Sequence, residues 1–231
     1  MRSLLTIITR TCKRPQGLAR AVKSVLAQTC KDWEQIFIVD KIGRHEGGNI
    51  PWANRQFSVN AHRVDGDYVF PLDDDGMFID DEFVGALKKT ITAWNGPEVV
   101  LIQTLSPSKA NGSCARILPE PPIWSIDWES GKRPSAWSGN GYCLVTRADI
   151  WKARIEAYYQ HNEVTGGDWH FCTSLIEGGC QFVKLDVCAT RSMSRGRGRK
   201  FETICPPDWF ERTAAALGIK EVAPGDWRLR G

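Results

Sequence analysis

The chain has 231 residues, a mass of 25.9 kDa and a formal net charge of +3 at pH 7. Its hydrophobic content of 42% and charged content of 25% are ordinary for a globular domain, which excludes collagen-like, coiled-coil and disordered classes. No apolar run approaches the roughly 20 residues that a membrane-spanning helix needs, and the N-terminal residues lack a signal peptide's cleavage region. We therefore expect a cytoplasmic protein without an integral membrane segment.

The positive charge is unevenly distributed along the chain. Residues 191–231 hold nine basic and five acidic side chains, whereas the first 190 residues hold 21 basic and 22 acidic ones. The basic cluster begins at Arg191 and continues through Arg195 to Lys200, interrupted by Gly196 and Gly198. Such a run is typical either of a solvated segment or of one that contacts phosphate groups.

A strand–helix–strand unit is predicted at the start of the chain. Residues 4–9 form a short β-branched apolar run, typical of a strand that is buried on both faces. Pro15 is favoured in the first turn of a helix, and apolar residues then recur at helical spacing as far as residue 28. Residues 35–39 are the second strand, which ends at Asp40. Because a helix connects them, the two strands should be parallel.

The later elements continue this alternation. Residues 67–72 are a predicted third strand, which runs directly into Asp73, Asp74 and Asp75. We expect further strands at 98–104, 141–146 and 182–189, and helices at 52–62, 83–94, 148–159 and 168–177. The pattern predicts an α/β fold, and open sheets of this class bind ligands at the carboxyl ends of their strands.

Three consecutive carboxylates are unusual at the end of a buried strand, because like charges repel unless a cation or hydrogen-bond donors offset them. Mg²⁺ and Mn²⁺ take oxygen ligands, and typically use one or two carboxylates together with substrate phosphates. In a tight turn, Asp73 and Asp75 could face one site while Asp74 faces elsewhere. Taken alone, the tripeptide is more often a solvated acidic turn.

The order and spacing of four blocks resemble the family 2 glycosyltransferases. Two of the blocks are Leu5-Thr-Ile-Ile-Thr-Arg-Thr-Cys-Lys-Arg-Pro15 and Gly66-Asp-Tyr-Val-Phe-Pro-Leu-Asp-Asp-Asp75. The others are residues 21–29 and 31–40, with weaker similarity at 138–147 and 166–170. The resemblance implies a single-domain GT-A (Rossmann-like) fold, with a mostly parallel central sheet flanked by helices. It also implies transfer of a sugar from a nucleotide-diphosphate donor to an acceptor hydroxyl.

A division of the chain follows from the resemblance. Residues 1–204 would be the catalytic domain, and residues 1–104 its nucleotide-sugar-binding half. Residues 105–190 would form the acceptor side, and residues 191–204 a basic mobile segment. Residues 205–231 are expected to add a C-terminal helix and a tail.

The resemblance further implies roles for single residues. Asp40 would hydrogen-bond the base or ribose, although the family's usual Asp-Asp-Gly is absent because Lys41 follows it. Asp73 and Asp75 would serve a Mn²⁺ or Mg²⁺ ion, with Asp75 as the direct ligand. The contacts to the nucleotide sugar would come from Thr9, Arg10, Thr11, Asp40, Asn54, Arg55, Asp73, Asp74, Arg191 and Arg195.

The catalytic base would be Asp168, which follows Gly166 and Gly167 at the start of a predicted helix. An aspartate in this position is also an excellent helix cap, so both interpretations stand. The acceptor would meet Trp137, Gly139, Asn140 and Trp169, although ordinary packing explains the tryptophans equally well.

We therefore predict a metal-dependent, inverting transferase that uses a UDP-sugar. A nucleotidyltransferase would want a glycine-rich, lysine-bearing first loop, and residues 9–15 contain no glycine. A non-catalytic module that binds nucleotide or nucleic acid would have no use for Asp73, Asp75 and Asp168 together. The acceptor is either a polysaccharide or lipid-linked glycan, or a nucleic acid such as DNA of phage type with hydroxymethylated bases. The basic run in residues 191–200 suits the second alternative.

Overall fold

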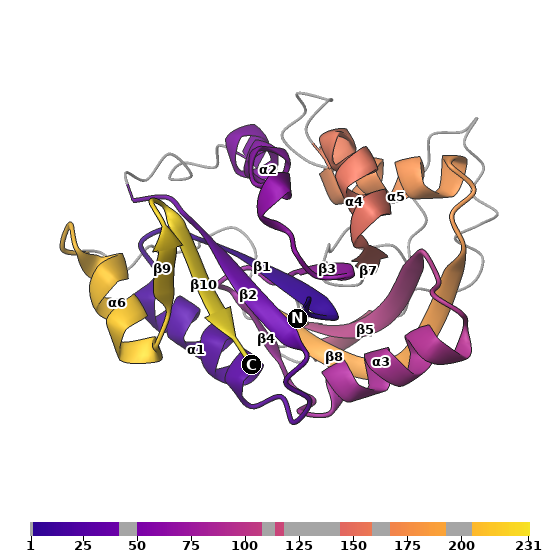
Figure 1. Cartoon of the computed structure of the whole chain (residues 1–231), viewed down its shortest axis with the longest axis horizontal. Coiled ribbons are helices and arrows are strands. Elements are labelled where there is room, and N and C mark those ends of the chain that lie inside the picture. Colours follow the sequence, from indigo (N-terminus) through magenta and orange to yellow (C-terminus); the bar gives the residue numbers. More distant parts are fainter. Residues whose placement is uncertain (1, 42–49, 108–113, 118–143, 159–166, 193–204) are drawn as a thin grey trace.

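A computed structural model describes residues 2–41, 50–107, 114–117, 144–158, 167–192 and 205–231 (Figure 1). For some of these, including 50–54 and 167–169, only the backbone is described. Within these ranges no helix combines the length and the apolar character needed to cross a bilayer.

In the described part of the chain, ten strands form one mixed sheet (Figure 1). Its order is β4-β8-β5-β7-β3-β1-β2-β10-β9, and β6 pairs with β5 outside this path. The strands are β1 (Leu5–Thr11), β2 (Trp33–Val39), β3 (Tyr68–Pro71), β4 (Gly76–Phe78), β5 (Val99–Pro107), β6 (Cys114–Ile117), β7 (Leu144–Arg147), β8 (Phe182–Ser192), β9 (Lys220–Ala223) and β10 (Asp226–Arg230).

The directions of the strands agree with the expected fold class. Strand β1 is parallel to both β2 and β3, and β5 is parallel to β8. Strand β7 runs antiparallel between β3 and β5, so that these five strands β1, β2, β3, β5 and β8 all point the same way. The prediction of a mostly parallel α/β sheet flanked by helices is therefore confirmed.

Helices cover both faces of the sheet. In Figure 1, α1, α3 and α6 lie on one face, and α2, α4 and α5 lie on the other. Two hydrophobic cores fill the two layers, one containing Phe70 and Phe83 and the other containing Phe57 and Trp151. The helices are α1 (Pro15–Leu26), α2 (Ile50–Val59), α3 (Phe83–Ala93), α4 (Ala148–Arg154), α5 (Gly167–Glu177) and α6 (Trp209–Leu217).

Two predicted helices are shorter than expected. The helix expected at 52–62 begins at Ile50 but ends at Val59, and a separate 3₁₀ turn follows at Ala61–Arg63. The helix expected at 148–159 ends at Arg154 and continues as the 3₁₀ turn Ile155–Tyr158.

The segment expected to be a C-terminal tail is a β-hairpin. The predicted helix is present as α6, and Gly218 then reverses the chain with a left-handed φ of 74°. Strands β9 and β10 follow, joined through Gly225 with a φ of 77°. Strand β10 pairs antiparallel with β2, placing Trp227 opposite Phe37. The hairpin thus adds two strands to the sheet beside β2, the strand that Asp40 follows.

A buried arginine fastens this hairpin to the body of the fold. The Nε and Nη2 of Arg63 donate to Oδ1 of Asp226 at 2.9 and 2.7 Å. Its Nη1 donates to the carbonyl of Phe37 in β2 at 3.1 Å. The side chain of Arg63 is only 7% exposed. If Asp226 were removed, water could not easily take its place beside the arginine.

Candidate functional site

The carboxyl ends of β1, β2 and β3 meet at one edge of the sheet. The amide of Asp40, just after β2, donates to the carbonyl of Thr11 at 2.9 Å. The amide of Asp74, after β3, donates to the carbonyl of Arg10 at 3.2 Å. Because both bonds continue the parallel ladders beyond the strands, the structure places Arg10, Thr11, Asp40 and residues 73–75 together.

Residues 73–76 form a closed turn, which we call the carboxylate turn, since the amide of Gly76 donates to the carbonyl of Asp73 at 2.9 Å. Arg10 donates two hydrogen bonds to the carboxylate of Asp73, from Nε to Oδ1 at 2.7 Å and from Nη2 to Oδ2 at 2.5 Å. The guanidinium carbon of Arg10 lies 4.1 Å from the centre of the Phe57 ring in α2. The negative charge of Asp73 is therefore balanced by the guanidinium of Arg10, which packs on the ring of Phe57.

The middle carboxylate, Asp74, points into the protein and is only 1% exposed. It accepts hydrogen bonds from Oγ1 of Thr11 at 2.9 Å and from the amide of Cys12 at 3.4 Å. Burial raises the pKa of Asp74 to about 7, against the opposing effect of the Arg14 cation. Asp74 was expected among the nucleotide contacts, but its burial gives it a supporting position beneath the turn.

Arg14 stands between the middle and last carboxylates. Its Nη1 lies 2.8 Å from Oδ1 of Asp74 and 3.8 Å from Oδ2 of Asp75. The backbone of Arg14 is fixed too, because its carbonyl accepts the amide of Leu18 at 2.9 Å in the first turn of α1. The start of α1 and the carboxylate turn are therefore joined by an ion pair.

Gly17 lets α1 approach this turn. A Cβ at Gly17 would lie only 2.6 Å from the carbonyl oxygen of Asp74, which is backbone and cannot rotate away. Glycine within a helix normally reduces stability by roughly 0.5–1 kcal/mol relative to alanine. Close contact with the turn explains why the helix has a glycine here.

We expect Gly17→Ala to lower the free energy of unfolding, because the new methyl group displaces the turn or the helix. The matched control is Gly85→Ala in α3, where the nearest atoms to an added Cβ are 3.8 and 3.9 Å away. That change should raise stability by about 0.5–1 kcal/mol through the ordinary helix preference. Denaturant unfolding of the two variants measures both, and stabilisation by both would contradict the close approach.

Thr9, one of the expected nucleotide contacts, lies inside the sheet. Its side chain is fully buried, and its hydroxyl donates to the carbonyl of Leu72 at 2.7 Å. The same hydroxyl accepts from Nε2 of Gln35 at 2.8 Å. The hydroxyl of Thr9 therefore links β2 to Leu72 and fixes the chain just before the carboxylate turn.

The structure describes the positions of further predicted site residues, among them Arg55, Arg191 and Asp168. Arg55 is exposed on α2, and Arg191 is exposed near the end of β8, opposite Met77 in the strand that leaves the carboxylate turn. Asp168 lies in the first turn of α5. The side chains of Asn54, Asp168 and Trp169 are outside the described residues, and so are Trp137, Gly139, Asn140 and Arg195.

The donor set of the turn can be compared with what a metal needs. Among the residues that the structure describes, no group of three or more His, Cys, Asp or Glu side chains could hold a metal ion. Asp73 is paired with Arg10, and both Asp74 and Asp75 are buried, so the turn offers a cation one or two carboxylates. Mg²⁺ and Mn²⁺ bound through one carboxylate and substrate phosphates fit this arrangement, whereas a cage made only of protein ligands does not.

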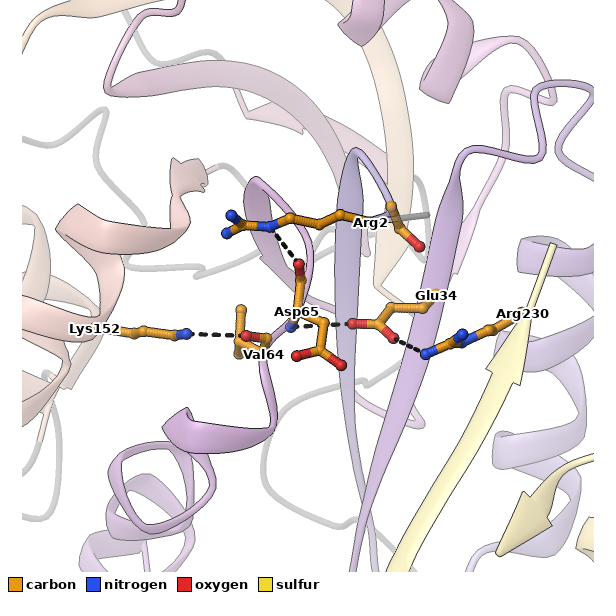
Figure 2. Close-up of a pocket in the computed structure, with 7 residues that line it drawn as sticks. Arg2, Glu34, Val64, Asp65, Lys152 and Arg230 are labelled. Atoms are coloured by element: carbon orange, nitrogen blue, oxygen red, sulfur yellow. Dashed lines mark hydrogen bonds and ion pairs between the residues drawn. The ribbon is translucent and has the colours of Figure 1, made fainter. Parts of the chain in front are cut away.

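A separate cavity of about 430 Å³ lies at the opposite end of these strands (Figure 2). Its polar side chains bond to the protein itself: Nζ of Lys152 donates to the carbonyl of Val64 at 2.9 Å, and Oε1 of Glu34 accepts the amide of Asp65 at 3.2 Å. Because ligands of open α/β sheets bind at the carboxyl ends of strands, this cavity is not the expected nucleotide site. The lining residues are Arg2, Ser3, Glu34, Val64, Asp65, Lys152 and Arg230.

Comparison with solved structures gives a clear match for the fold. TarS from S. aureus superposes with a TM-score of 0.57 and 13% sequence identity, over 94% of this chain and 39% of TarS. TarS residues 1–349 in complex with UDP-GlcNAc match with a TM-score of 0.59 and 12% identity, over 94% of this chain and 65% of that one. The complex of the same TarS fragment with UDP gives 0.57 and 13%, over 94% and 64%.

The likeness is one of fold. This chain spans less than two thirds of the length of these TarS structures. No protein-family model matches the chain, and no curated protein matches it either. The α/β arrangement expected from the sequence is thus shared with a protein of known nucleotide-sugar complexes, at an identity too low to carry residue roles across.

Sequence reasoning missed three contributors to the site, namely Arg14, Gly17 and Phe57. A signal for Arg14 was present, because three adjacent carboxylates need counter-charges, and Arg10 and Arg14 lie at the end of β1 and just after it. Phe57 and Gly17 act through contacts between elements, and nothing in their local sequence marks them.

Proposed function

We propose that this protein is a glycosyltransferase that takes its sugar from a UDP-sugar, uses Mg²⁺ or Mn²⁺, and transfers the sugar with inversion to an acceptor hydroxyl. The observation that carries the proposal is the carboxylate turn beside Asp40 at the carboxyl ends of β1, β2 and β3. The shared fold with TarS, whose structures hold UDP and UDP-GlcNAc, supports the choice of donor.

The residues of the turn suggest how the donor is held. Asp40, buried at the end of β2, would bind the nucleoside, and Arg10 and Thr11 would border the diphosphate. Asp75, assisted by Asp73, would hold the metal, which when bound offsets the charge that develops on the leaving diphosphate. Arg191 lies opposite Met77, the residue just after the turn, from where its cation can approach the same phosphates.

Asp168 is the proposed base. It lies in the first turn of α5, and an aspartate carboxylate is a common general base. Its carboxylate would take the proton of the acceptor hydroxyl while that oxygen bonds to the anomeric carbon. The bond from the anomeric carbon to the diphosphate breaks at the same time, and the nucleoside diphosphate leaves with the bonding electrons.

The acceptor is proposed to be a polyanion, specifically DNA with hydroxymethylated bases. The support is the excess of positive charge in residues 191–231, which begins at Arg191. A polysaccharide or lipid-linked glycan is the alternative acceptor. An assay with a UDP-sugar that carries a labelled sugar distinguishes the two acceptors, if transfer of the label to duplex DNA with hydroxymethylated bases is measured. Hydrolysis of the donor, which releases the labelled sugar to water, is measured as the background reaction.

A thermal-shift screen of nucleotide sugars, with Mn²⁺ or with EDTA, tests the donor and the metal together. A ligand present at about 100 times its Kd stabilises the folded protein by about 2.7 kcal/mol, and each kcal/mol raises the melting temperature of a chain of this size by about 2–4 °C. We expect UDP and one UDP-sugar to raise it by several degrees when Mn²⁺ is present, and by clearly less in EDTA. Absence of any shift with UDP, with or without metal, would refute the proposed function.

A further inference from the structure

The carboxylate turn contains a feature that donor binding does not explain, namely the burial of its middle carboxylate against an arginine. We propose that Arg14, acting through Asp74, is a positioning residue that holds Asp75 and Asp73 toward the nucleotide diphosphate. This inference rests on the function proposed above.

All described partners of the Asp74 side chain come from one short segment. Thr11, at the end of β1, and Cys12 and Arg14, just after it, contact Asp74 at 2.9, 3.4 and 2.8 Å. The amide of Asp74 also donates to Arg10 in the same segment, at 3.2 Å. The centre of the carboxylate turn is therefore bound to the end of β1 and to the residues just after it.

This anchor restricts the two flanking carboxylates. Asp73 and Asp75 are one residue to either side of Asp74, so a fixed Asp74 leaves them little freedom to rotate inward. Arg14 also reaches one of these carboxylates directly, since the nitrogen that contacts Asp74 lies 3.8 Å from Oδ2 of Asp75. Arg14 thus sets the position of the carboxylate proposed to serve the metal, without needing to touch the donor itself.

The energetics favour a positioning role over simple stabilisation. Burying a charged pair removes both groups from water, and such pairs often contribute no more to stability than apolar residues of the same shape. A solvated acidic turn would have needed none of this burial. Groups that must be preorganised for charged ligands, in contrast, gain from rigid supporting contacts.

A double-mutant cycle of Arg14→Gln and Asp74→Asn tests the proposal, with Kd for UDP measured by calorimetry in saturating Mn²⁺ and again in EDTA. Each single change should weaken Mn²⁺-dependent UDP binding at least tenfold. The double variant should be within threefold of the weaker single variant, because both changes remove the same contact. The affinity for UDP in EDTA, which reports the nucleoside contacts, should not change, whereas general damage would lower both.

Arg20→Gln is the matched control, since Arg20 is exposed on the same helix. Its Kd for UDP should equal that of the wild type. If Arg14→Gln does not fold, Arg14→Lys replaces it: a lysine keeps the charge but lacks the planar fork, so that Mn²⁺-dependent binding should weaken at least threefold.

The outcomes separate this inference from the proposed function. Metal-dependent UDP binding by the wild type with an unchanged Kd in the Arg14 variants overturns only the role of Arg14. Independent, multiplying effects of the two single changes overturn it as well. No UDP binding by the wild type overturns the proposed function and this inference together.

Discussion

Replacement of Asp75 by asparagine is expected to reduce sugar transfer by about 10²–10³-fold, the usual effect of removing one group that stabilises developing charge. Asparagine keeps the shape of the side chain but removes the negative charge that would hold the cation. The residue is mostly buried at the edge of the turn, so the change acts on a fixed geometry. Transfer measured across a series of Mn²⁺ concentrations should show both the lower rate and a lost dependence on metal.

Asp81→Asn provides the control for this prediction. Asp81 is an exposed carboxylate only a few residues farther along the chain, beyond β4. Its loss changes the net charge by the same amount without touching the carboxylate turn, and it should leave the rate within about twofold of the wild type. Equal activity in the Asp75 variant and the wild type over the Mn²⁺ series would show that the turn does not hold the metal.

Asp226→Asn should lower the free energy of unfolding by about 3 kcal/mol, the lower end of what breaking a buried ion pair costs. Asp226 is 19% exposed and its partner Arg63 is 7% exposed, so the arginine would lose its counter-charge in a site that water reaches poorly. The hairpin would also lose one of its side-chain links to the body of the fold, because Arg63 contacts the carbonyl of Phe37 in β2 as well. Urea unfolding at pH 7 measures the difference.

The difference should depend on pH with a definite sign. Burial raises the pKa of Asp226, but hydrogen bonds from Arg228 and Arg63 outweigh this effect and hold the pKa below its ordinary value of 3.8. A carboxyl whose pKa is lowered by folding contributes stability above that ordinary value, and this contribution is lost as the pH falls through the folded value. The gap between the wild type and the Asp226 variant should therefore be constant near neutrality and shrink below about pH 4.

Asp208→Asn is the matched control, because Asp208 pairs with Arg212 one helical turn away in a site where both side chains are exposed. Exposed pairs of this kind contribute about 0.3–0.5 kcal/mol. A loss at Asp208 as large as the loss at Asp226 would mean that burial of the Arg63 pair has no special effect.

The sequence predicted the fold where apolar patterns are long and regular. Strand β1, helix α1 and strand β2 were all recognisable, because a buried β-branched run and a helical stripe have distinct periods. The hairpin of β9 and β10 was not, since the side chains of β9 are all exposed and its strands are short. Its signal was a turn sequence, Pro224-Gly225, and its partner β2 lies far back in the chain.

The sequence predicted where the candidate site lies better than it predicted which side chains contact one another there. The ends of β1, β2 and β3 had to meet once the sheet was parallel, which brought Asp40 and the carboxylate turn together. Which way each side chain points depends on partners more than 60 residues away, as with Thr11 and Asp74. The direction of the Thr9 side chain could not be predicted either. Strand β1 is buried on both faces, so its sequence does not alternate between apolar and polar residues in a way that distinguishes the two faces.

The position of β10 has a consequence for the order in which the molecule assembles. Strand β2 lies next to β1 early in the chain, yet its other edge is completed by a strand whose Arg228 is 194 residues away from Glu34. Contacts of such high sequence separation slow folding, because the intervening chain must be ordered before they form. During synthesis, β2 therefore has an open hydrogen-bonding edge until almost all of this sequence has emerged from the ribosome, and an unprotected edge of this kind invites mispairing.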